Sequence, residues 1–473
     1  MTSNNNIYLP KSISNTAIIS YIVALMLVSI IFHRYATQWY FMLFGIIEVV
    51  GFYHYGNVLS KQYSNYSEKY FRSQIFKTAL LIRVVYVLFS YWFYDFMTGR
   101  PFEFSAADSL FYNDSASDIA LIFSEGDFNI TKVLPDVDVS DIGYSVYLSI
   151  VYYIFFDSIL IARLIKALMS AYMCVLIYNL ARRNFGEGVG RMSSIFTMLC
   201  PNLIYYCGMH LKETEMVFIT ILALDNFDAV FRGSKITFKS LIVPFLMLLL
   251  TFTVRTVLGL SIIFAIGVTI LLADSRIISR SRKFVVILIL GLFSVAFLWS
   301  YISPVVQELW IKKDSQKANM EWRSRRENGN KFAKYAGATV FAPLIFSIPF
   351  PTMVEIPKQE DQQMVNGNNF VKNVLSFFTI FSLFIIVLKH KSWRNYIFVL
   401  SYLMAYIGSL VLSEFAQSER FHLPALPIEL IFAAYGISQI TPKTKKLINV
   451  WCAFMIVVAV AWNWFKLAGR NLI

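Results

Sequence analysis

Between two apolar regions of this chain lies the stretch RPFEFSAADSLFYNDSASDIALIFSEGDFNITKVLPDVDVSDIGY, from Arg100 to Tyr144. It holds nine acidic residues, opposed only by Arg100 and Lys132. Charges and unpaired backbone groups cost several kcal/mol each in hydrocarbon, so the stretch cannot cross a lipid bilayer. The flanking runs of Leu, Ile, Val, Phe and Tyr can cross one. We therefore expect the acidic stretch to lie at one face of a membrane.

The composition of the whole chain agrees with this. Of 473 residues, 57% are hydrophobic and only 15% are charged, whereas a soluble chain carries about 25% charged residues. Several apolar runs approach the roughly 20 residues that cross a bilayer as a helix. The sequence predicts an all-α polytopic membrane protein with about 13 transmembrane helices, in a range of about 11–14, and with extracytoplasmic loop helices.

The net charge of +13 could point to nucleic acid, but its distribution does not. Lys and Arg stand in short clusters between apolar runs, which is the pattern that sets membrane orientation. This pattern places the links around 57–73, 181–187, 389–394 and 441–446 in the cytoplasm, and the acidic stretch on the opposite face. The start of the chain is polar and no A-x-A-like cleavage site follows the first apolar run, so we expect that run to be its own insertion signal.

We divide the chain into four parts on these grounds. Residues 1–73 hold two additional N-terminal helices, and 74–303 form a core whose first external loop is 97–142. Residues 304–369 form an extracytoplasmic loop, and 370–473 hold the C-terminal helices. The expected helices lie near 15–33, 38–56, 74–96, 158–180, 188–207, 214–231, 283–303, 370–388, 395–413, 423–440 and 447–464, with a short interfacial or re-entrant helix at 143–156 and two short spans within 240–273 that turn near Arg255. The four cysteines have no C-x-x-C spacing and are expected to be small core residues, with neither disulfides nor zinc.

The first candidate site lies in the acidic stretch. If Asp108 to Ala120 is helical, with Ser105 and Asp108 at its start, then Asp108 and Tyr112 share a face at i, i+4, and Asp114 follows. A carboxylate at a membrane interface can take a proton from an acceptor hydroxyl or hold a divalent cation. The alternative is a solvated loop helix whose aspartates only cap and solubilise it.

A second candidate is the segment His210-Leu-Lys212-Glu213-Thr-Glu215. Four ionisable groups crowd into six residues at a helix entrance, where acidic residues are stabilised by about 0.3–1 kcal/mol. That is a sufficient structural explanation. The functional alternative is that Glu213 is a second carboxylate facing Asp108, with Lys212 near an anionic group. His210 and His422 are both external, but no spacing supports them as metal ligands.

Two arginines are candidates for phosphate binding. Arg255 interrupts an apolar run, where a cation is expensive and suggests function, although it could also extend its side chain to the interface. Arg420 lies in Ser418-Glu419-Arg420-Phe421-His422-Leu423-Pro424, just before a helix with prolines in its first turn. A planar guanidinium suits bidentate binding of phosphate. The cluster around Arg323–Lys334 could contact lipid headgroups, but a solvated charge run explains it better.

The order of these segments resembles the GT-C superfamily of glycosyltransferases that use polyprenyl-phosphate sugars, such as protein O-mannosyltransferases and lipid A aminoarabinose transferases. Four groups of residues carry the resemblance: Asp108-x3-Tyr112-x3-Ala116 continuing to Gly126-Asp127-Phe128; Gly143-Tyr144-x2-Tyr147-Leu148, Ala162-Arg163-Leu164 and Arg182-Arg183-x-Phe185-Gly186; Pro201-Asn-Leu-Ile-Tyr-Tyr followed by Lys212-Glu213; and Glu419-Arg420-Phe421-His422-Leu423-Pro424-Ala425-Leu426-Pro427.

The resemblance implies a sugar transfer at the extracytoplasmic face, with inversion. Asp108 would be the base, although Asp114 and Asp118 are alternative acids, and Glu213 would be the second acidic residue. Tyr112, Asp114, His210 and His422 would line the substrate site, and Arg255, Arg420 or Lys212 would stabilise the leaving phosphate. No cofactor is required, and a divalent cation is an option.

The implied partners are a polyprenyl-phosphate-linked sugar, a glycan, lipid or protein acceptor, and membrane lipid, without nucleic acid. We expect an integral protein of a bacterial inner (plasma) membrane. Two alternatives stay open. One is a polymerase or ligase of lipid-linked oligosaccharides that uses the long 304–369 loop. The other is a flippase or transporter of lipid-linked sugars, which would need charges along a path through the membrane.

Overall fold

A computed structural model describes residues 7–135, 139–233, 238–273, 321, 324–325, 329–332, 342–412 and 418–473. It is 81% helical, and the part of the chain that it describes contains no strand. Seven of the described helices are long and apolar enough to cross a membrane, and three shorter ones are also apolar. The predicted class, an all-α polytopic membrane protein, is confirmed. The number of about 13 transmembrane helices and the four-part division stay predictions.

The N-terminal half supplies the helices α1 (Lys11–Ile31), α2 (Trp39–Gln62), α3 (Glu68–Thr98), α4 (Ala107–Ser124), α5 (Val139–Phe155), α6 (Ile159–Phe185), α7 (Glu187–Leu199), α8 (Pro201–Cys207), α9 (Glu213–Arg232), α10 (Phe238–Val254) and α11 (Thr256–Leu272). The C-terminal half supplies α15 (Glu360–Met364), α16 (Asn366–Phe384), α17 (Ile397–Leu412), α18 (Glu419–His422), α19 (Leu426–Ser438) and α20 (Pro442–Ala468). Short 3₁₀ and π turns join several of them.

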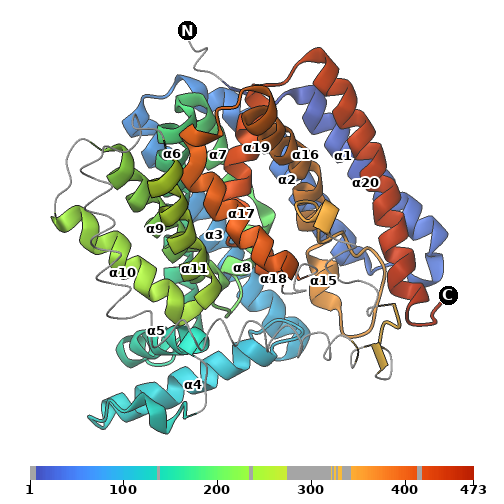
Figure 1. The fold of residues 1–473 in the computed structure, drawn as a ribbon. Helices are drawn as coiled ribbons and strands as arrows, with labels where there is room; N and C mark the ends of the chain where they lie inside the picture. Colours follow the sequence, from blue (N-terminus) through green and yellow to red (C-terminus); the bar gives the residue numbers. More distant parts are fainter. Residues whose placement is uncertain are drawn as a thin grey trace.

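The long helices form a bundle, and α4 and α5 lie across its lower end (Figure 1). At one side α1 and α20 run side by side, and α2 packs against both α16 and α7. Around the middle of the bundle α6 contacts α3, α7 and α9, while α10 packs against α9 and α5. The two crossing helices therefore cover the end of the bundle where α9 and α18 begin. The interfacial helix predicted at 143–156 corresponds to α5, which begins a few residues earlier.

Proline and an embedded arginine set the boundary between α7 and α8. A single helix was expected at 188–207, but the structure has two, since Pro201 lacks an N–H and Cys200 before it is extended. The carbonyls of Thr197 and Met198 at the end of α7 accept hydrogen bonds from the Arg83 guanidinium at 3.1 Å each. Arg83 is fully buried, and it replaces the hydrogen bonds that the break removes.

The break that was predicted near Arg255 is confirmed. The α10 helix ends at Val254 and α11 begins at Thr256, while Arg255 between them is extended, with φ −168° and ψ 108°. Neither helix reaches the roughly 20 residues of an ordinary span. The junction between them therefore brings a charged side chain to the end of two apolar helices.

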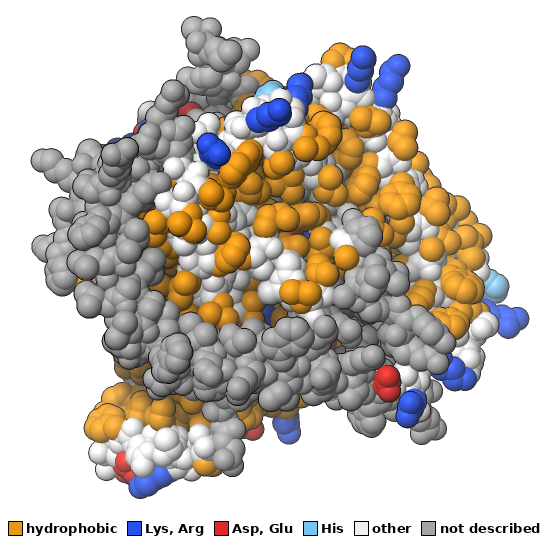
Figure 2. Space-filling view, in the orientation of Figure 1, with side chains coloured by type: hydrophobic (Ala, Val, Ile, Leu, Met, Phe, Trp, Pro, Cys, Tyr) orange, Lys and Arg blue, Asp and Glu red, His pale blue; other side chains and the backbone are white. Residues whose placement is uncertain are grey.

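The flank of the bundle is apolar. Figure 2 shows hydrophobic side chains spread over it, with Lys and Arg side chains at its rims. Large apolar residues such as Ile30, Trp92 and Val457 are each more than 60% exposed. A surface of this kind is stable in contact with lipid tails and costly in water. The four cysteines are free and buried, as predicted.

Some predicted features lie outside the described residues. They are the helix at 283–303, most of the 304–369 loop up to residue 341, Asp136 and Asp138, and Arg323, Arg326 and Lys334 of the basic cluster. The remainder of that loop, from 342 to 365, is described and packs against the bundle: Met353 and Val354 are fully buried there.

Candidate functional site

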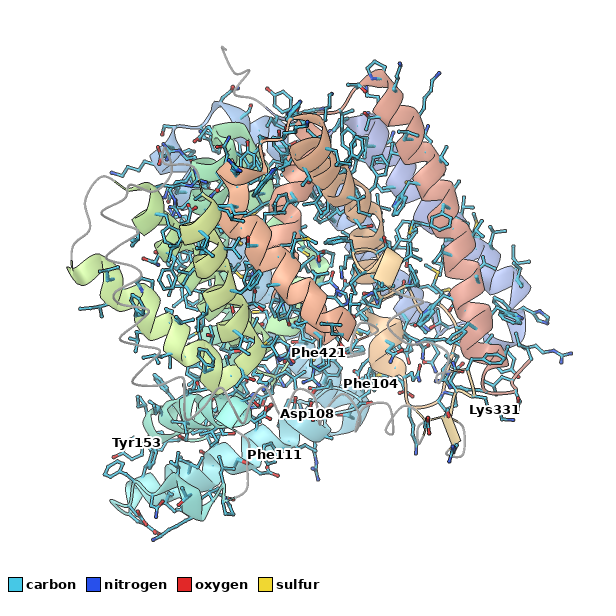
Figure 3. All side chains as sticks on the ribbon, viewed as in Figure 1. Phe104, Asp108, Phe111, Tyr153, Lys331 and Phe421 are labelled. Carbon is cyan, nitrogen blue, oxygen red and sulfur yellow. The ribbon has the colours of Figure 1, made fainter. Side chains whose placement is uncertain are left out.

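The candidate site is built around Asp108, which stands in the first turn of α4. The predicted helix is confirmed, and it places Asp108 and Tyr112 one turn apart. Ser105 does not begin the helix, which starts at Ala107 with Ala106 as its N-cap. The backbone N–H of Ser105 donates to Asp361 of α15 at 2.9 Å. Figure 3 shows Asp108 at the end of α4 that points toward Phe421 of α18.

Arg420 of α18 joins Asp108 to Glu213. Its Nη1 donates to Asp108 Oδ2 at 2.6 Å and its Nε donates to Glu213 Oε1 at 2.9 Å. The three residues come from α4, α18 and α9, which are far apart in the sequence. The Glu213 side chain is fully buried, that of Arg420 is 30% exposed and that of Asp108 is 54% exposed. The cluster is therefore anchored at Glu213 and reaches solvent at Asp108.

A second ion pair lies beside the first. Lys212 pairs with Asp141 of α5 and also donates to the Ser140 carbonyl at 2.9 Å. The Tyr112 hydroxyl donates to the same Asp141 carboxylate at 3.0 Å, and the Lys212 ammonium lies 6.0 Å from the centre of the Tyr112 ring. Asp141 was counted in the acidic stretch but not chosen as a site residue. Only the fold shows that it meets Lys212, 71 residues away.

The charges of this second pair are mutually dependent. Burial alone would raise the pKa of Asp141, but the Lys212 ammonium and the bonds from Lys212 and Tyr112 outweigh it and lower that pKa. Burial lowers the pKa of Lys212, since Asp141 only partly compensates the loss of water. Lys212 is therefore a cation that an additional anion would stabilise further.

Arg255 lies next to both pairs. Its guanidinium carbon stands 4.3 Å from the centre of the Phe421 ring, one residue after Arg420. Tyr406 of α17 takes part in a hydrogen bond with Arg255, and its hydroxyl also donates to the Phe421 carbonyl at 2.8 Å. The charge of Arg255 acts on Asp141, Lys212 and Glu213. Three cations and three carboxylates thus gather at one place.

The structure does not bring every predicted residue into this cluster. The His210 imidazole is buried and stands 3.1 Å from the Tyr152 hydroxyl, against the edge of Phe102. Burial, with the charges of Arg163 and Lys166, lowers the pKa of His210 well below its usual range, so its ring is neutral. Asp114 is exposed and accepts from the Asn113 amide. His422 is buried in α18.

The loop before α4 contains contacts that sequence reasoning missed. Asp361 accepts from the backbone N–H groups of Phe104 and Ser105 at 3.3 and 2.9 Å. The Arg163 guanidinium donates to the Pro101 carbonyl, and the Ser109 hydroxyl donates to the Glu103 carboxylate. A polar residue next to an apolar run does not indicate which group it will bond to. The hydrogen-bond partners of these groups could therefore be found only from the fold.

The described residues contain no group of three or more His, Cys, Asp or Glu side chains arranged to hold a metal ion. Within the cluster, Arg420 forms ion pairs with both Asp108 and Glu213. That no cofactor is required stays a prediction.

Residues 142–300 match the family described as dolichyl-phosphate-mannose-protein mannosyltransferase. The matched residues, about a third of the chain, run from α5 through α11 and contain Lys212, Glu213 and Arg255. Asp108 and Arg420 lie outside them. No curated protein matches the chain. The family match confirms the resemblance to GT-C glycosyltransferases and, together with the apolar helices, supports an integral membrane glycosyltransferase.

Proposed function

We propose that this protein transfers a sugar from a polyprenyl-phosphate-linked donor to an acceptor hydroxyl at the extracytoplasmic face of a bacterial plasma membrane, with inversion at the anomeric carbon. The observation that carries the proposal is the bridge from Arg420 to both Asp108 and Glu213. It joins a solvent-facing carboxylate, which can accept a proton, to a guanidinium of the kind that binds phosphate.

In the proposed reaction the acceptor oxygen attacks the anomeric carbon of the sugar. The bond between that carbon and the phosphate oxygen breaks, and the polyprenyl phosphate leaves with the electron pair. Asp108 takes the proton of the acceptor hydroxyl. The leaving phosphate gains negative charge, which Arg420, Arg255 and Lys212 stabilise, and loss of one such group typically costs about a hundredfold to a thousandfold in rate.

The ion pair between Asp108 and Arg420 suggests an order of binding. While Nη1 of Arg420 holds Asp108 Oδ2, that carboxylate is directed at the guanidinium and not at an acceptor hydroxyl. A donor phosphate can replace Asp108 at Nη1 while Nε stays on the buried Glu213. Arrival of the donor would then release Asp108 as the base for the acceptor, so the donor binds first.

The transporter alternative receives less support from the embedded cations. Arg83 donates to backbone carbonyls at the end of α7, and Lys166 donates to the Met209 and Leu211 carbonyls of the loop before α9. These two buried cations close gaps in the backbone hydrogen bonding of the bundle, which gives them a structural role. The polymerase or ligase alternative depends on the 304–369 loop, and most of that loop before residue 342 lies outside the described residues.

The proposal is tested in a strain that lacks the gene, complemented with the wild type or with Asp108→Asn. Mass spectrometry of lipid extracts and of the envelope glycan should show that the wild type restores one sugar and that Asp108→Asn leaves the polyprenyl-phosphate sugar unused. Accumulation of complete single repeat units would indicate a polymerase instead. Transport in liposomes without transfer would favour a flippase, and full activity of Asp108→Asn would remove Asp108 as the base.

A further inference from the structure

Two carboxylates stand behind the Asp108–Arg420 pair, and neither contacts the site itself. Glu419 precedes Arg420 in the one-turn helix α18, and Asp361 lies in α15, next to the loop that leads to Asp108. Both are only partly buried, and both bond to elements that are distant in the sequence. The bonds of Glu419 and Asp361 take no direct part in the proposed reaction. They can affect it by fixing the positions of Arg420 and Asp108.

Glu419 fixes α18 to the interior of the bundle. The buried Asn202 side chain of α8 donates to Glu419 Oε1 at 2.6 Å, and the Asn369 side chain of α16 also bonds to this carboxylate. Lys372 of α16 acts on the same carboxylate by its charge. A helix of four residues cannot hold itself in place, because one turn has too few internal hydrogen bonds. The position of Arg420 therefore depends on the bonds of Glu419 as well as on its own bond to Glu213.

Asp361 fixes the loop that leads to Asp108, as Glu419 fixes α18. The α4 helix begins after Ala106, whose methyl side chain cannot accept a capping hydrogen bond. The two backbone N–H groups just upstream, those of Phe104 and Ser105, donate to the two oxygens of Asp361. The Phe104 ring packs against Tyr94 of α3, 5.6 Å between centres. Asp361 thus joins the 342–365 segment to the start of the helix that carries the proposed base.

We propose that Glu419 and Asp361 are positioning residues, the first holding Arg420 and the second holding Asp108, so that the pair meets where donor phosphate and acceptor hydroxyl bind. This rests on the proposed function. A shift of about 1 Å in a catalytic group can lower a rate about a hundredfold. The two residues act on different partners, so their loss has different kinetic effects.

The test compares Glu419→Ala and Asp361→Ala with the wild type in nanodiscs. Transfer is measured with the donor identified in vivo, and binding is measured with polyprenyl phosphate alone. Glu419→Ala should lower kcat about tenfold to a hundredfold, raise the donor KM and weaken binding of polyprenyl phosphate. Asp361→Ala should lower kcat to a similar extent without raising the donor KM or weakening the binding of polyprenyl phosphate, because it holds the base.

Conservative variants and neighbours separate positioning from folding. Glu419→Gln keeps an acceptor for Asn202 and should recover most of the rate that Glu419→Ala loses. Ser418→Ala and Glu360→Gln are matched neighbours, since Ser418 makes no capping bond through its side chain, and both should behave as the wild type. If the wild-type protein transferred no sugar in any assay, the proposed function would be refuted. The binding of polyprenyl phosphate to Glu419→Ala would still decide the role of Glu419. The inference is overturned if both alanine variants keep wild-type kinetics, or if kcat falls only in proportion to the loss of folded protein.

Discussion

Arg420 Nη1 lies 2.6 Å from Asp108 Oδ2. The proposed base is thus paired with the group that is expected to bind the donor phosphate. Because the side chain of Asp108 is 54% exposed and that of Glu213 is fully buried, the bond to Asp108 is the weaker of the two that Arg420 makes. Competition between carboxylate and phosphate for one guanidinium has a consequence that can be measured.

Asp108→Asn should bind polyprenyl phosphate more tightly than the wild type while it loses transfer. Removal of the carboxylate charge frees Nη1 of Arg420, and an exposed ion pair is worth up to about 1 kcal/mol, which corresponds to about a fivefold change in Kd. Binding is measured in nanodiscs by fluorescence or by thermal shift. Asp118→Asn removes the same charge from an exposed position on α4 and serves as the control. Equal or weaker binding by Asp108→Asn would argue against the competition.

Arg420→Lys should fail to restore the transfer that Arg420→Ala loses. Arg420 uses two different nitrogens for two carboxylates, and a single ammonium cannot hold both in the same geometry. We expect kcat to fall about a hundredfold or more in both variants, the usual loss for a group that stabilises developing charge. The measurement is steady-state transfer at saturating donor. If lysine supported more than half of the wild-type rate, positive charge alone would be enough.

Chelation of divalent cations should leave transfer unchanged. Arg420 already occupies an oxygen of Asp108 and an oxygen of Glu213, the two carboxylates that a cation would need. Transfer is assayed after dialysis against EDTA and again after addition of Mg²⁺ or Mn²⁺. A rate that disappears with EDTA and returns with one metal would show that a cation takes part and that Arg420 moves away to admit it.

The all-α polytopic class and the positions of the long apolar helices in the described residues could be predicted from the sequence, because membrane spans are specified locally, by about 20 consecutive residues. The break at Arg255 was predictable for the same reason, since one charge in a long apolar run is a strong local signal. The division into α7 and α8 was missed, although Pro201 was visible. A proline in an apolar run can either kink a helix or end it, and the Arg83 contacts that stabilise the end come from another helix.

The candidate site was predictable only in part. Asp108 could be chosen from the acidic stretch and Arg255 as a charge inside an apolar run. Lys212, Glu213 and Arg420 could be chosen as charges at the start of apolar helices. Their pairing could not be derived, and Asp141, Glu419 and Asp361 were missed. Each of these three resembles any other acid in a polar link until the fold shows its partner. His210 was chosen on residue type, but the fold places it against Tyr152 and Phe102.

Gly143→Ala should disturb the contact between α5 and α10. A Cβ at Gly143 would clash with Thr253 Oγ1 and would lie 2.7 Å from the Thr253 carbonyl oxygen, so the helices would have to separate. Overpacking of this kind costs about 1–3 kcal/mol, and it would also move Asp141, two residues earlier, away from Lys212. Thermal unfolding and transfer are both expected to decline. Gly408→Ala is the control, because a Cβ there meets nothing within 4 Å.

Glu419→Gln should stabilise the protein at pH 8 but not at pH 4. Burial raises the pKa of Glu419 from its ordinary value of 4.5 to about 7, although Asn202, Lys372 and Asn369 oppose the change. A carboxyl whose pKa is raised on folding contributes stability below its unfolded pKa, and this contribution is lost as the pH rises through the folded value.

At pH 8 the wild type therefore holds an unfavourable charge that glutamine lacks, and the gain is on the order of 2 kcal/mol. Unfolding is followed in detergent at both pH values, with Glu360→Gln as the control. If the difference in the free energy of unfolding between Glu419→Gln and the wild type were the same at the two pH values, Glu419 would not titrate in this range. Greater stability of Glu419→Gln at pH 8, together with slow transfer by Glu419→Ala, would show that Glu419 lowers the stability of the protein while it holds Arg420 in position.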